Sequence, residues 1–465
     1  MISSVGDFKS IFFIGVAGTG MSAIAQYLSG VGKIVKGSDR YFNTDQYNET
    51  RTKLEEAGIK CFIQNGEGIT EDTDLVIISA AIEDTVAEVQ KAKSLSIPII
   101  KRSELLSMIA RSKKTIAIGG TSGKSTTSAM LFEIMETAGH QPGIISGAGL
   151  VSLIRKGKIG NTKVGQGEWL IIEADESDGS IVEYTPEVGL LLNVDKDHQE
   201  LEELVNLFTI FKHNTTGLFI VNQSNVFAKV LSQDIRQDFS TQHSCPAGFV
   251  GVGFQQRAFN ITFRISIYGK HQHQLFSVST IGRHNMENAI AAIAIAYQLG
   301  ISLELCQEGL VNYQGIYRRH QMLGIKNGVC VIDDYAHNPV KCAASILACQ
   351  GIASKVVAWF QPHGYGPTRF LKNDFINEIS AVLRPQDEIW MSEIFYAGGT
   401  TEKNISSNDL ISEISASGKN AFFIEDRKDF LENVRSHLTT DTVLLLMGAR
   451  DPGLEEFSSS IWKNL

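Results

Sequence analysis

Two short apolar runs in this chain each end in a glycine-rich turn, and a helical stretch follows each turn. Ile11–Ile14 leads through glycines into a helical pattern over Met21–Leu28, and Thr115–Ile118 leads into a second glycine turn over 119–127. Strands that alternate with helices form parallel sheets, because each crossover helix has to pack on a face of the sheet. The repeated unit therefore predicts an α/β fold built on parallel sheets.

Strand and helix patterns divide the 465 residues into three regions, which predict domains at 1–108, 109–315 and 316–465. A chain of this length exceeds what one hydrophobic core supports. Within 223–281, alternating runs such as Ala258–Ile267 favour antiparallel strands. The expected strands are Ile11–Ile14, Lys33–Lys36, Asp74–Ile78, Thr115–Ile118, Trp169–Ile172, Val188–Leu192, Leu218–Val221, Val329–Ile332, Lys355–Phe360, Glu388–Met391 and Thr442–Met447, and Asn285–Leu299 is an expected helix.

Composition excludes several classes of protein. The hydrophobic fraction of 43% and the charged fraction of 20% are typical of globular rather than disordered chains. A net charge of -9 argues against a dedicated nucleic-acid binder, which neutralises phosphates with Lys and Arg. The six cysteines lack CxxC spacing, and we find no export signal and no apolar run of about 20 residues. We therefore expect a cytoplasmic protein with reduced thiols and no membrane partner.

The first glycine turn is Gly15-Val-Ala-Gly18-Thr-Gly20. Glycines let the backbone approach a pyrophosphate, which then lies at the positive end of the following helix. Ala17 takes the place of the second glycine of the usual GxGxxG pattern. Ser38 and Asp39 follow the second expected strand, where an acidic residue commonly meets a ribose or base. Spacing alone leaves nucleotide binding and simple strand–helix packing about equally open.

The second turn, Gly119-Gly120-Thr121-Ser122-Gly123-Lys124-Ser125-Thr126-Thr127, is typical of a phosphate-binding loop. Backbone amides of such a loop hold phosphates, Lys124 reaches the β- and γ-phosphates, and Ser125 can ligate Mg²⁺. The strict GxxxxGK[ST] spacing is not met, because Ile118 stands at its first glycine position. An ordinary loop with a solvated lysine is the alternative, and the lysine at a helix start favours phosphate binding.

Two more strands of the same region end in polar runs. Glu173-Ala-Asp175-Glu176-Ser177-Asp178 follows one strand, and Asn193-Val-Asp195-Lys-Asp197-His198 follows another. Carboxylates at the end of a strand suit Mg²⁺, which prefers oxygen ligands. A solvated acidic turn and a merely hydrogen-bonded histidine are the alternatives. The phosphate loop in the same region favours metal binding, with His198 beside acids as a second candidate ligand site.

Three later runs carry further candidates: Gly282-Arg-His-Asn285-Met-Glu-Asn288, Arg318-Arg319 and Ile332-Asp333-Asp334-Tyr335. Asparagine offers both donors and acceptors to an adenine edge, and arginine suits a γ-phosphate. Taken alone, these runs are equally compatible with a helix cap, a basic surface turn and another acidic strand end.

Together the motifs resemble one family, the Mur ligases of peptidoglycan synthesis, over nearly the whole chain and in the same order. The most specific pieces are GTSGKSTT, EADESDGS, NVDKDH, GRHNMENA, YRRH, DDYAHNP and FQPH. The resemblance implies a Rossmann-like N-terminal domain for the UDP part of a substrate, a central P-loop-type ATPase domain, and a Rossmann-like C-terminal domain that brings an amine. It also implies a monomer or homodimer that uses ATP and Mg²⁺ and acts on UDP-N-acetylmuramate and L-alanine.

In the reaction that the resemblance implies, the substrate carboxylate attacks the γ-phosphate of ATP to give an acyl-phosphate. The amine then displaces phosphate to form an amide. Mg²⁺ and Lys124 would offset the charge that develops on the transferred phosphoryl group.

The resemblance also assigns roles to residues that match the family's motifs. The implied catalytic residues are Lys124, Glu173, His198 and Arg319, and the implied metal ligands are Ser125, Glu173 and His198. The implied ATP contacts are Gly120, Thr121, Gly123, Lys124, Ser125, Thr126, Asn285, Asn288, Arg319 and Asp334, the last of these at the ribose. The implied substrate contacts are Gly15, Gly18, Gly20, Ser38, Asp39, Ser79 and Arg102 in the first region and Tyr335, His337, His363 and Arg369 in the third.

The side that would hold the amine departs from the family's pattern. Ser122 and Asn338 stand where members of this type usually have histidine, and Arg450 stands where they usually have glycine. After FQPH the family usually has arginines that hold a carboxylate, and here Gly364 and Pro367 carry no charge. We hypothesise that ligase chemistry is retained while the amine partner has changed or widened.

Three alternatives remain open from the sequence. A related ligase that attaches a tripeptide to the same sugar is disfavoured by the triplet Gln361-Pro362-His363. A paralogue that binds UDP-sugar or ATP without turnover is disfavoured by Lys124, Glu173 and His198 together. A Rossmann dehydrogenase would leave the second phosphate loop unexplained.

Overall fold

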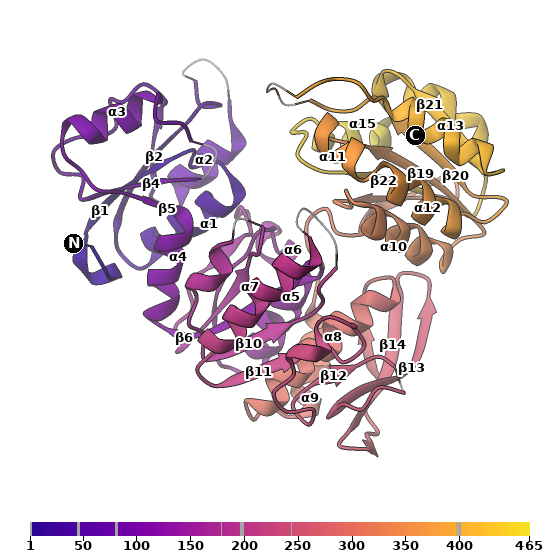
Figure 1. The fold of residues 1–465 in the computed structure, drawn as a ribbon, viewed down its shortest axis with the longest axis horizontal. Helices are drawn as coiled ribbons and strands as arrows, with labels where there is room; N and C mark the ends of the chain where they lie inside the picture. The colour runs from indigo at the N-terminus through magenta and orange to yellow at the C-terminus, as the bar shows by residue number, and fades with distance from the viewer. Residues whose placement is uncertain are drawn as a thin grey trace. The chain divides into compact units, whose positions relative to one another are not determined.

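The computed structural model describes residues 2–43, 47–79, 82–177, 179–195, 200–242, 244–396, 398 and 401–465. The chain forms two compact units, each an assembly of helices on sheets (Figure 1). Unit 1 comprises Met1–Val252, Arg264–Phe276 and Glu287–Gln314, and unit 2 comprises Gly253–Phe263, Ser277–Met286 and Gly315–Leu465. The α/β fold class predicted from the sequence is confirmed.

The first sheet of unit 1 has the order β3-β2-β1-β4-β5, and its neighbouring strands are parallel. Ile11 and Phe13 of β1 cluster with α1 (Thr19–Gly30) and α4 (Arg102–Arg111) on one face, whereas Phe12 and Ile14 cluster with α3 (Ala87–Ser94) on the other. Because both faces are covered, the consecutive residues Ile11–Ile14 of β1 are all apolar. The remaining bounds are β1 (Ser10–Ile14), β2 (Ile34–Asp39), β3 (Lys60–Ile63), β4 (Leu75–Ile78), β5 (Ile99–Lys101), α2 (Glu49–Glu56) and the 3-10 turn η1 (Val5–Asp7).

The second sheet of unit 1 has the order β11-β10-β6-β9-β7-β8, in which β7 runs antiparallel to β8 and the other neighbours are parallel. Phe208 and Phe211 of α7 (Leu201–Asn214) pack into its core. Helices α5 (Lys124–Thr137) and α9 (Leu303–Asn312) approach closely, since a Cβ on Gly309 would lie 2.4 Å from the Cα of Ile134. The strands are β6 (Lys114–Gly119), β7 (Gly143–Ile145), β8 (Thr162–Lys163), β9 (Trp169–Ala174), β10 (Val188–Leu191) and β11 (Leu218–Val221), with α6 (Val151–Ile154), η2 (Ser180–Glu183) and η3 (Lys229–Leu231) beside them.

A third sheet fills the interval that was predicted to be antiparallel, and the prediction is wrong for one pair. Strands β14 (Asn260–Ile267) and β15 (Lys270–His271) pair antiparallel, but β12 (Phe239–Ser240) and β13 (Phe249–Arg257) pair in parallel. Alternating polarity reports which face of a strand is buried and carries no information on strand direction. Strand β16 (Phe276–Val278) pairs with β14, and α8 (Arg283–Gln298) follows.

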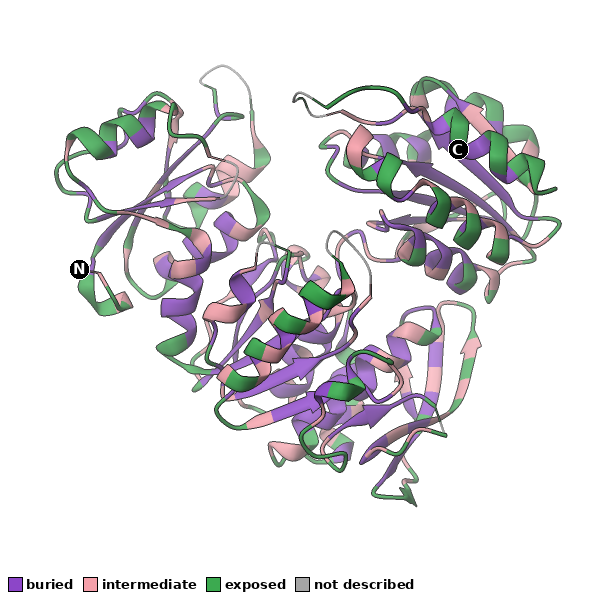
Figure 2. Cartoon of the chain, in the orientation of Figure 1, coloured by how far each residue is buried: buried purple, intermediate pink, exposed green. Residues whose placement is uncertain are grey.

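The main sheet of unit 2 has the order β17-β18-β22-β19-β20-β21, in which β17 runs antiparallel to β18 and the other neighbours are parallel. Helices α10 (Pro339–Gln350), α12 (Lys372–Val382) and α13 (Ser407–Ala416) share one hydrophobic cluster, and α14 (Phe430–Val434) and α15 (Leu454–Asn464) share another. Figure 2 shows the central strands almost wholly buried between these layers. The strands are β17 (Gln321–Lys326), β18 (Val329–Asp334), β19 (Lys355–Gln361), β20 (Glu388–Ser392), β21 (Asn420–Ile424) and β22 (Thr442–Gly448), with α11 (Tyr365–Phe370), η4 (Arg427–Asp429) and η5 (Arg435–His437).

Every strand predicted from the sequence is present, with ends that differ by a few residues. Strand β2 extends to Asp39, so Ser38 and Asp39 lie within the strand and not after it. The predicted helix Asn285–Leu299 corresponds to α8.

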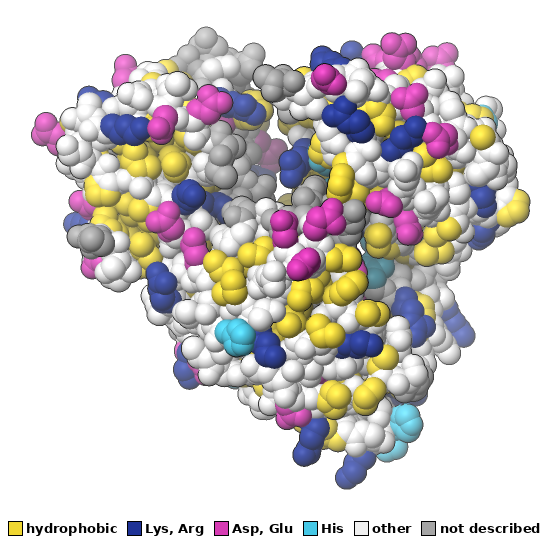
Figure 3. Space-filling model, in the orientation of Figure 1, with side chains coloured by type: hydrophobic (Ala, Val, Ile, Leu, Met, Phe, Trp, Pro, Cys, Tyr) yellow, Lys and Arg dark blue, Asp and Glu magenta, His cyan; other side chains and the backbone are white. Residues whose placement is uncertain are grey.

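All six cysteines are free, as expected. Within the part of the chain that the structure describes, no helix combines the length and apolar character needed to cross a membrane. Lys and Arg side chains are interspersed with Asp and Glu on the face shown in Figure 3.

The two large sheets of unit 1 are tied together through the buried side chain of Asn161. Its Nδ2 donates to the carbonyl oxygen of Thr19 at 2.8 Å and to Ser22 Oγ at 2.9 Å. Its Oδ1 accepts a hydrogen bond from Gln26 Nε2 at 2.9 Å. Asn161 precedes β8 of the second sheet, and its three partners belong to α1 of the first. Because buried polar groups need partners, these bonds fix α1 against the second sheet.

Replacing Asn161 with alanine removes all three bonds, including the buried one to Ser22 Oγ. We expect Asn161→Ala to lower the free energy of unfolding by about 1–3 kcal/mol. Urea denaturation checks this, with Asn312→Ala as the control because the exposed Asn312 amide donates only to Thr137 Oγ1, at 3.2 Å. Equal losses in the two variants would contradict the role of Asn161.

Candidate functional site

The loop between β6 and α5 adopts a conformation that only glycine accommodates easily. Gly120 has φ +135° and Gly123 has φ +86°, values that side-chain-bearing residues rarely adopt. A Cβ on Gly123 would lie 2.4 Å from Asn288 Oδ1. The loop therefore turns tightly at its two glycines and delivers the chain to Lys124, the first residue of α5.

Asn193, which follows β10, holds this loop by its side chain. Its Oδ1 accepts hydrogen bonds from Thr121 Oγ1 at 2.9 Å and from the Ser122 amide at 2.8 Å. Its Nδ2 donates to the Ser122 carbonyl at 3.1 Å. Asn193 was not among the predicted site residues. The sequence feature that could have indicated Asn193 is its position after a predicted buried strand. In the structure that strand, β10, lies next to β6.

Lys124 is almost buried and lies among acceptors. Its Nζ donates to the Gly120 carbonyl and to Glu176 Oε2, both at 2.6 Å, and Asp175 Oδ1 lies 4.0 Å away. Burial alone would lower the pKa of Lys124, but the charges of Glu176 and Asp175 outweigh it and raise the pKa. Burial likewise opposes ionisation of Asp175, and Lys124 nevertheless lowers its pKa. Lys124 is therefore positively charged at neutral pH. Glu176 was quoted in a motif but was not predicted as a site residue.

Two of the predicted metal ligands, Ser125 and Glu173, are in direct contact. Ser125 Oγ donates to Glu173 Oε2 at 2.9 Å, and Glu173 Oε1 accepts from Ser146 Oγ at 2.6 Å and from the Gly147 amide at 2.7 Å. A hydroxyl beside a carboxylate is an oxygen donor set of the kind that Mg²⁺ prefers. His198, the third predicted ligand, lies outside the described residues. No group of three His, Cys, Asp or Glu side chains with metal-ligand geometry occurs among the residues described.

The other residues predicted to contact ATP make contacts within the protein. Thr127 Oγ1 donates to Asn288 Oδ1 at 3.2 Å, and Thr126 interacts with the hydroxyl of Tyr313, whose pKa is raised by burial. Asn285 Nδ2 donates to Thr280 Oγ1 at 2.9 Å and to the Ile281 carbonyl at 2.7 Å. Asn285 and Asn288 both belong to α8. Their role toward an adenine ring stays a prediction.

In the first domain the predicted substrate contacts gather around the end of β1. The amide of Gly15 donates to the Ser38 carbonyl at 2.8 Å, and the amide of Ala17 donates to Asp39 Oδ2 at 3.0 Å. A Cβ on Gly20 would lie 3.0 Å from Arg102 Nη1, so the guanidinium crosses the start of α1. Gly18 caps that helix, and Ser79 directly follows β4. The ends of β1 and β2 therefore meet the start of α1 here, beside the Arg102 guanidinium, and a helix N-terminus of this kind suits an anion.

The adjacent arginines of unit 2 differ in their surroundings. Arg318 is buried, with Nε donating to Asp333 Oδ2 at 3.0 Å and Nη2 to the Gly448 carbonyl at 3.0 Å. Arg319 lies over the ring of Tyr335, 4.7 Å from its centroid. Arg318 and His320 both have left-handed φ, at +53° and +45°. Strained backbone of this kind occurs at functional sites, and here it flanks the arginine that was predicted to meet the γ-phosphate.

Asp334, predicted to meet a ribose, is buried and holds hydrogen bonds inside its own domain. It accepts from the amides of His320 at 2.6 Å and Ala336 at 2.8 Å and from Ser345 Oγ at 3.1 Å. Burial opposes its ionisation, but His320 and Arg319 lower its pKa. In this structure Asp334 positions the turn after β18, and contact with a ribose stays a prediction.

Three predicted substrate contacts form a row of rings at the ends of β18 and β19. The ring centroids of Tyr335 and His337 are 5.7 Å apart, and those of His337 and His363 are 5.8 Å apart. Arg369 lies apart from this row, exposed on α11, and its Nη1 donates to Asn404 Oδ1 at 2.5 Å. The structure therefore groups Tyr335, His337 and His363 but gives Arg369 a different partner.

The departures from the family pattern have local structural counterparts. Gly364 has φ +73° and ψ 126°, a combination open essentially to glycine, and a Cβ there would lie 3.2 Å from Pro367 Cδ. Asn338 caps α10 by accepting from the Lys341 amide at 2.9 Å. Arg450 has a left-handed φ of +63°, at the position where glycine was expected.

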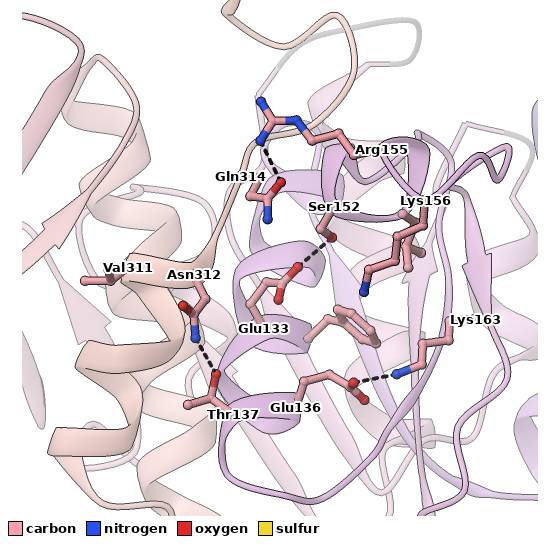
Figure 4. A pocket seen from close by; sticks show the side chains of 12 residues that line it. Glu133, Glu136, Thr137, Ser152, Arg155, Lys156, Lys163, Val311, Asn312 and Gln314 are labelled. Carbon is pink, nitrogen blue, oxygen red and sulfur yellow. Dashed lines mark hydrogen bonds and ion pairs between the residues drawn. The ribbon is translucent and has the colours of Figure 1, made fainter.

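A cleft that sequence reasoning did not predict lies at the C-terminal end of α5, with a volume of about 590 Å³ (Figure 4). Glu133 accepts a hydrogen bond from Ser152 Oγ at 2.7 Å, and Glu136 pairs with Lys163. Arg155 Nη1 donates to Gln314 Oε1 at 2.8 Å at the rim. The cleft and the phosphate loop lie at opposite ends of α5, so they are separate features.

Comparisons with known proteins agree on one family. The models described as Mur ligase family, catalytic domain, Mur ligase middle domain, and Mur ligase, glutamate ligase domain match residues 10–114, 118–296 and 318–450. The chain is 31% identical over 454 residues to the UDP-N-acetylmuramate–L-alanine ligase of Mesorhizobium japonicum, with 94% of each chain covered. It is 32% identical over 459 residues to the protein of the same name from Carboxydothermus hydrogenoformans, with 96% of this chain and 95% of the relative covered.

Solved structures show the same fold. The UDP-N-acetylmuramate-alanine ligase MurC of Thermotoga maritima superposes with a TM-score of 0.80 at 24% identity, with 98% of each chain covered. A murein peptide ligase of Psychrobacter arcticus superposes with a TM-score of 0.67 at 19% identity, again with 98% of each chain covered.

Asn193 provides a direct test of the phosphate loop. Asn193→Ala removes three hydrogen bonds that hold Thr121 and Ser122, so the loop amides are no longer pre-arranged for an anion. We expect the affinity for ADP, measured by isothermal titration calorimetry, to fall by about tenfold or more, as for the loss of one or two hydrogen bonds to a charged group. Asn420→Ala, on β21 of the other unit, serves as the control, and an ADP affinity equal to wild type in Asn193→Ala would refute the role.

Glu133 gives a prediction about stability and pH. Burial raises the pKa of Glu133 above its usual value, against the effects of Ser152 and nearby lysines. The folded state therefore binds this proton more tightly than the unfolded state, and the resulting stability is lost as pH rises through the folded pKa. Glu133→Gln should raise Tm at about pH 8 and leave it unchanged or lower at about pH 4. Glu136→Gln, which breaks the pair with Lys163, should give no such gain, and an identical pH response in both variants would contradict the assignment.

Proposed function

The chain belongs to the Mur ligase family, and on that premise we propose that it joins UDP-N-acetylmuramate to L-alanine in an ATP-dependent step of peptidoglycan synthesis. One observation carries the proposal beyond the family name. The buried, charged Lys124 and the contacting pair Ser125 and Glu173 lie together at the ends of neighbouring strands β6 and β9. Together they form a site that suits the polyphosphate of a nucleotide and an accompanying cation.

We assign the three parts of the substrate set to three domains, at 1–108, 109–315 and 316–465. The gathering of Arg102 and Asp39 at the first glycine loop supports UDP binding by the first domain. The phosphate loop supports ATP binding by the second. The row Tyr335, His337 and His363 supports entry of the amine at the strand ends of the third. We further propose a cytoplasmic monomer or homodimer.

The proposed reaction has two steps. The substrate carboxylate attacks the γ-phosphorus of ATP, which releases ADP and gives an acyl-phosphate. The amine then attacks the acyl carbon and expels inorganic phosphate, which leaves an amide and a proton. Lys124 would bind the phosphates, and the loop amides held by Asn193 would be aligned in advance, so little reorganisation is needed during the reaction. Ser125, Glu173 and His198 would hold Mg²⁺, which would supply charge stabilisation to the phosphoryl group.

A second candidate differs only in the amine. Gly364 and Pro367 carry no charge, and Arg369 donates to Asn404 instead of extending from the row of rings. A carboxylate clamp made of arginines after His363 is therefore lacking among the described residues of this loop. The observation favours a ligase whose amine is another amino acid or a short peptide.

Phosphate release from ATP distinguishes these candidates. Purified protein is incubated with UDP-N-acetylmuramate, Mg²⁺ and single amino acids or short peptides, and the amide product is identified by mass spectrometry. We expect release to depend on both the UDP-sugar and L-alanine. Lys124→Ala should lower kcat by about 10²–10³-fold, as for the loss of one group that stabilises transition-state charge.

Each other outcome has a definite meaning. Turnover with a different amine alone would replace L-alanine with that amine and confirm the change at Gly364 and Pro367. No turnover with any amine, from a protein that still binds ADP, would overturn the ligase function and favour a binding protein.

A further inference from the structure

Among the residues that the structure describes, Glu176 is the carboxylate closest to Lys124. Its Oε2 accepts from Lys124 Nζ at 2.6 Å, and the side chain is only 6% exposed. The lysine's other close acceptor is the carbonyl of Gly120, also at 2.6 Å. Two of the three ammonium hydrogens are therefore engaged within the protein.

The neighbouring carboxylates are not equivalent to Glu176. Glu173 accepts three hydrogen bonds, from Ser125, Ser146 and the Gly147 amide, and these bonds fix its carboxylate. Asp175 lies 4.0 Å from Lys124 Nζ, and its side chain is 41% exposed. Of the described carboxylates beside Lys124, Glu176 is the one that combines direct contact with burial.

A buried lysine without a counter-ion is strongly unfavourable, so the pair stabilises the loop when no nucleotide is bound. The same pair opposes nucleotide binding. A phosphate that reaches Lys124 Nζ approaches the Glu176 carboxylate as well, and two like charges so close together in a buried site repel strongly. Lys124 can bind the phosphates fully only after its ion pair with Glu176 is broken.

We propose that Glu176 is the resting-state counter-ion of Lys124, which the phosphates of an adenine nucleotide displace when they bind. The proposal rests on the proposed function in that the ligand is an adenine nucleotide. Glu176 is thus a positioning residue that acts through Lys124. It keeps the loop ordered when no nucleotide is bound. The apparent affinity for nucleotide is then the intrinsic affinity multiplied by the fraction of time in which Lys124 is not paired with Glu176.

The decisive measurement is the Kd of ADP by isothermal titration calorimetry, with and without Mg²⁺, for wild type and Glu176→Gln. Glutamine keeps the size of the side chain and removes the charge. We expect Glu176→Gln to bind ADP about tenfold more tightly without Mg²⁺, as for a lysine that was available about one tenth of the time. Glu168→Gln is the matched control, because Glu168 pairs with Lys114 at 2.9 Å at the exposed start of the same strand, and its ADP affinity should equal wild type.

Further readouts separate this role from a purely structural one. The Tm of the nucleotide-free protein should fall in Glu176→Gln, while the rise in Tm on adding ADP should exceed that of wild type. The KM for ATP should fall more than kcat changes. In a Lys124→Met background, Glu176→Gln should no longer tighten ADP binding, because the two side chains act as one pair. Glu176→Asp, which keeps the charge on a shorter side chain, should lie between wild type and Glu176→Gln.

Unchanged or weaker ADP binding by a folded Glu176→Gln variant would overturn the counter-ion role, and so would an equal gain in Glu168→Gln. The proposed function fails differently: a wild-type protein that binds no adenine nucleotide overturns the ligase assignment. Wild type that binds ADP, with no gain in Glu176→Gln, overturns only the inference about Glu176.

Discussion

The ammonium group of Lys124 lies buried at the start of α5, and the ends of three neighbouring strands meet its requirements. Strand β6 supplies the loop that carries it, β9 supplies the acids that keep it charged, and β10 supplies Asn193, which holds the loop. An uncompensated charge at this depth would destabilise the fold, so the acids serve stability as well as chemistry. The site is therefore a consequence of how the parallel sheet places its strand ends.

The same principle operates in the other sheets. In a parallel sheet all carboxyl ends lie along one edge, so polar residues that follow different strands come together although they are far apart in sequence. Asp39 and the glycine loop meet in this way at β1 and β2, and Tyr335, His337 and His363 form a row of rings after β18 and β19. Polar and aromatic residues therefore gather at the carboxyl ends of strands in three of the sheets.

Much of this arrangement was predictable, because glycine turns and apolar strands have local signatures. The positions of the strands along the chain and the phosphate loop follow from that reading, and the resemblance to the family placed Ser125 and Glu173 together as metal ligands, which are in contact. Pairings that depend on distant chain segments were not predictable, such as the parallel partner of β13 and the exposed edge strand β17. Asn193 and Glu176 were missed as site residues because their roles come from side-chain contacts across the sheet. The spacing of residues in the sequence does not reveal such contacts.

The loop after His363 is subject to a different kind of constraint from the phosphate loop. At Lys124 the requirement is electrostatic, because phosphate binding depends on the positive charge of this side chain. After His363 the requirement is in the backbone, since φ +73° with ψ 126° at Gly364 excludes most side chains, arginine included. Restoring an arginine there would therefore require the backbone to change first. The backbone conformation at position 364 selects glycine, and glycine carries no charge. A changed amine site would therefore arise from the loop conformation and from this residue together.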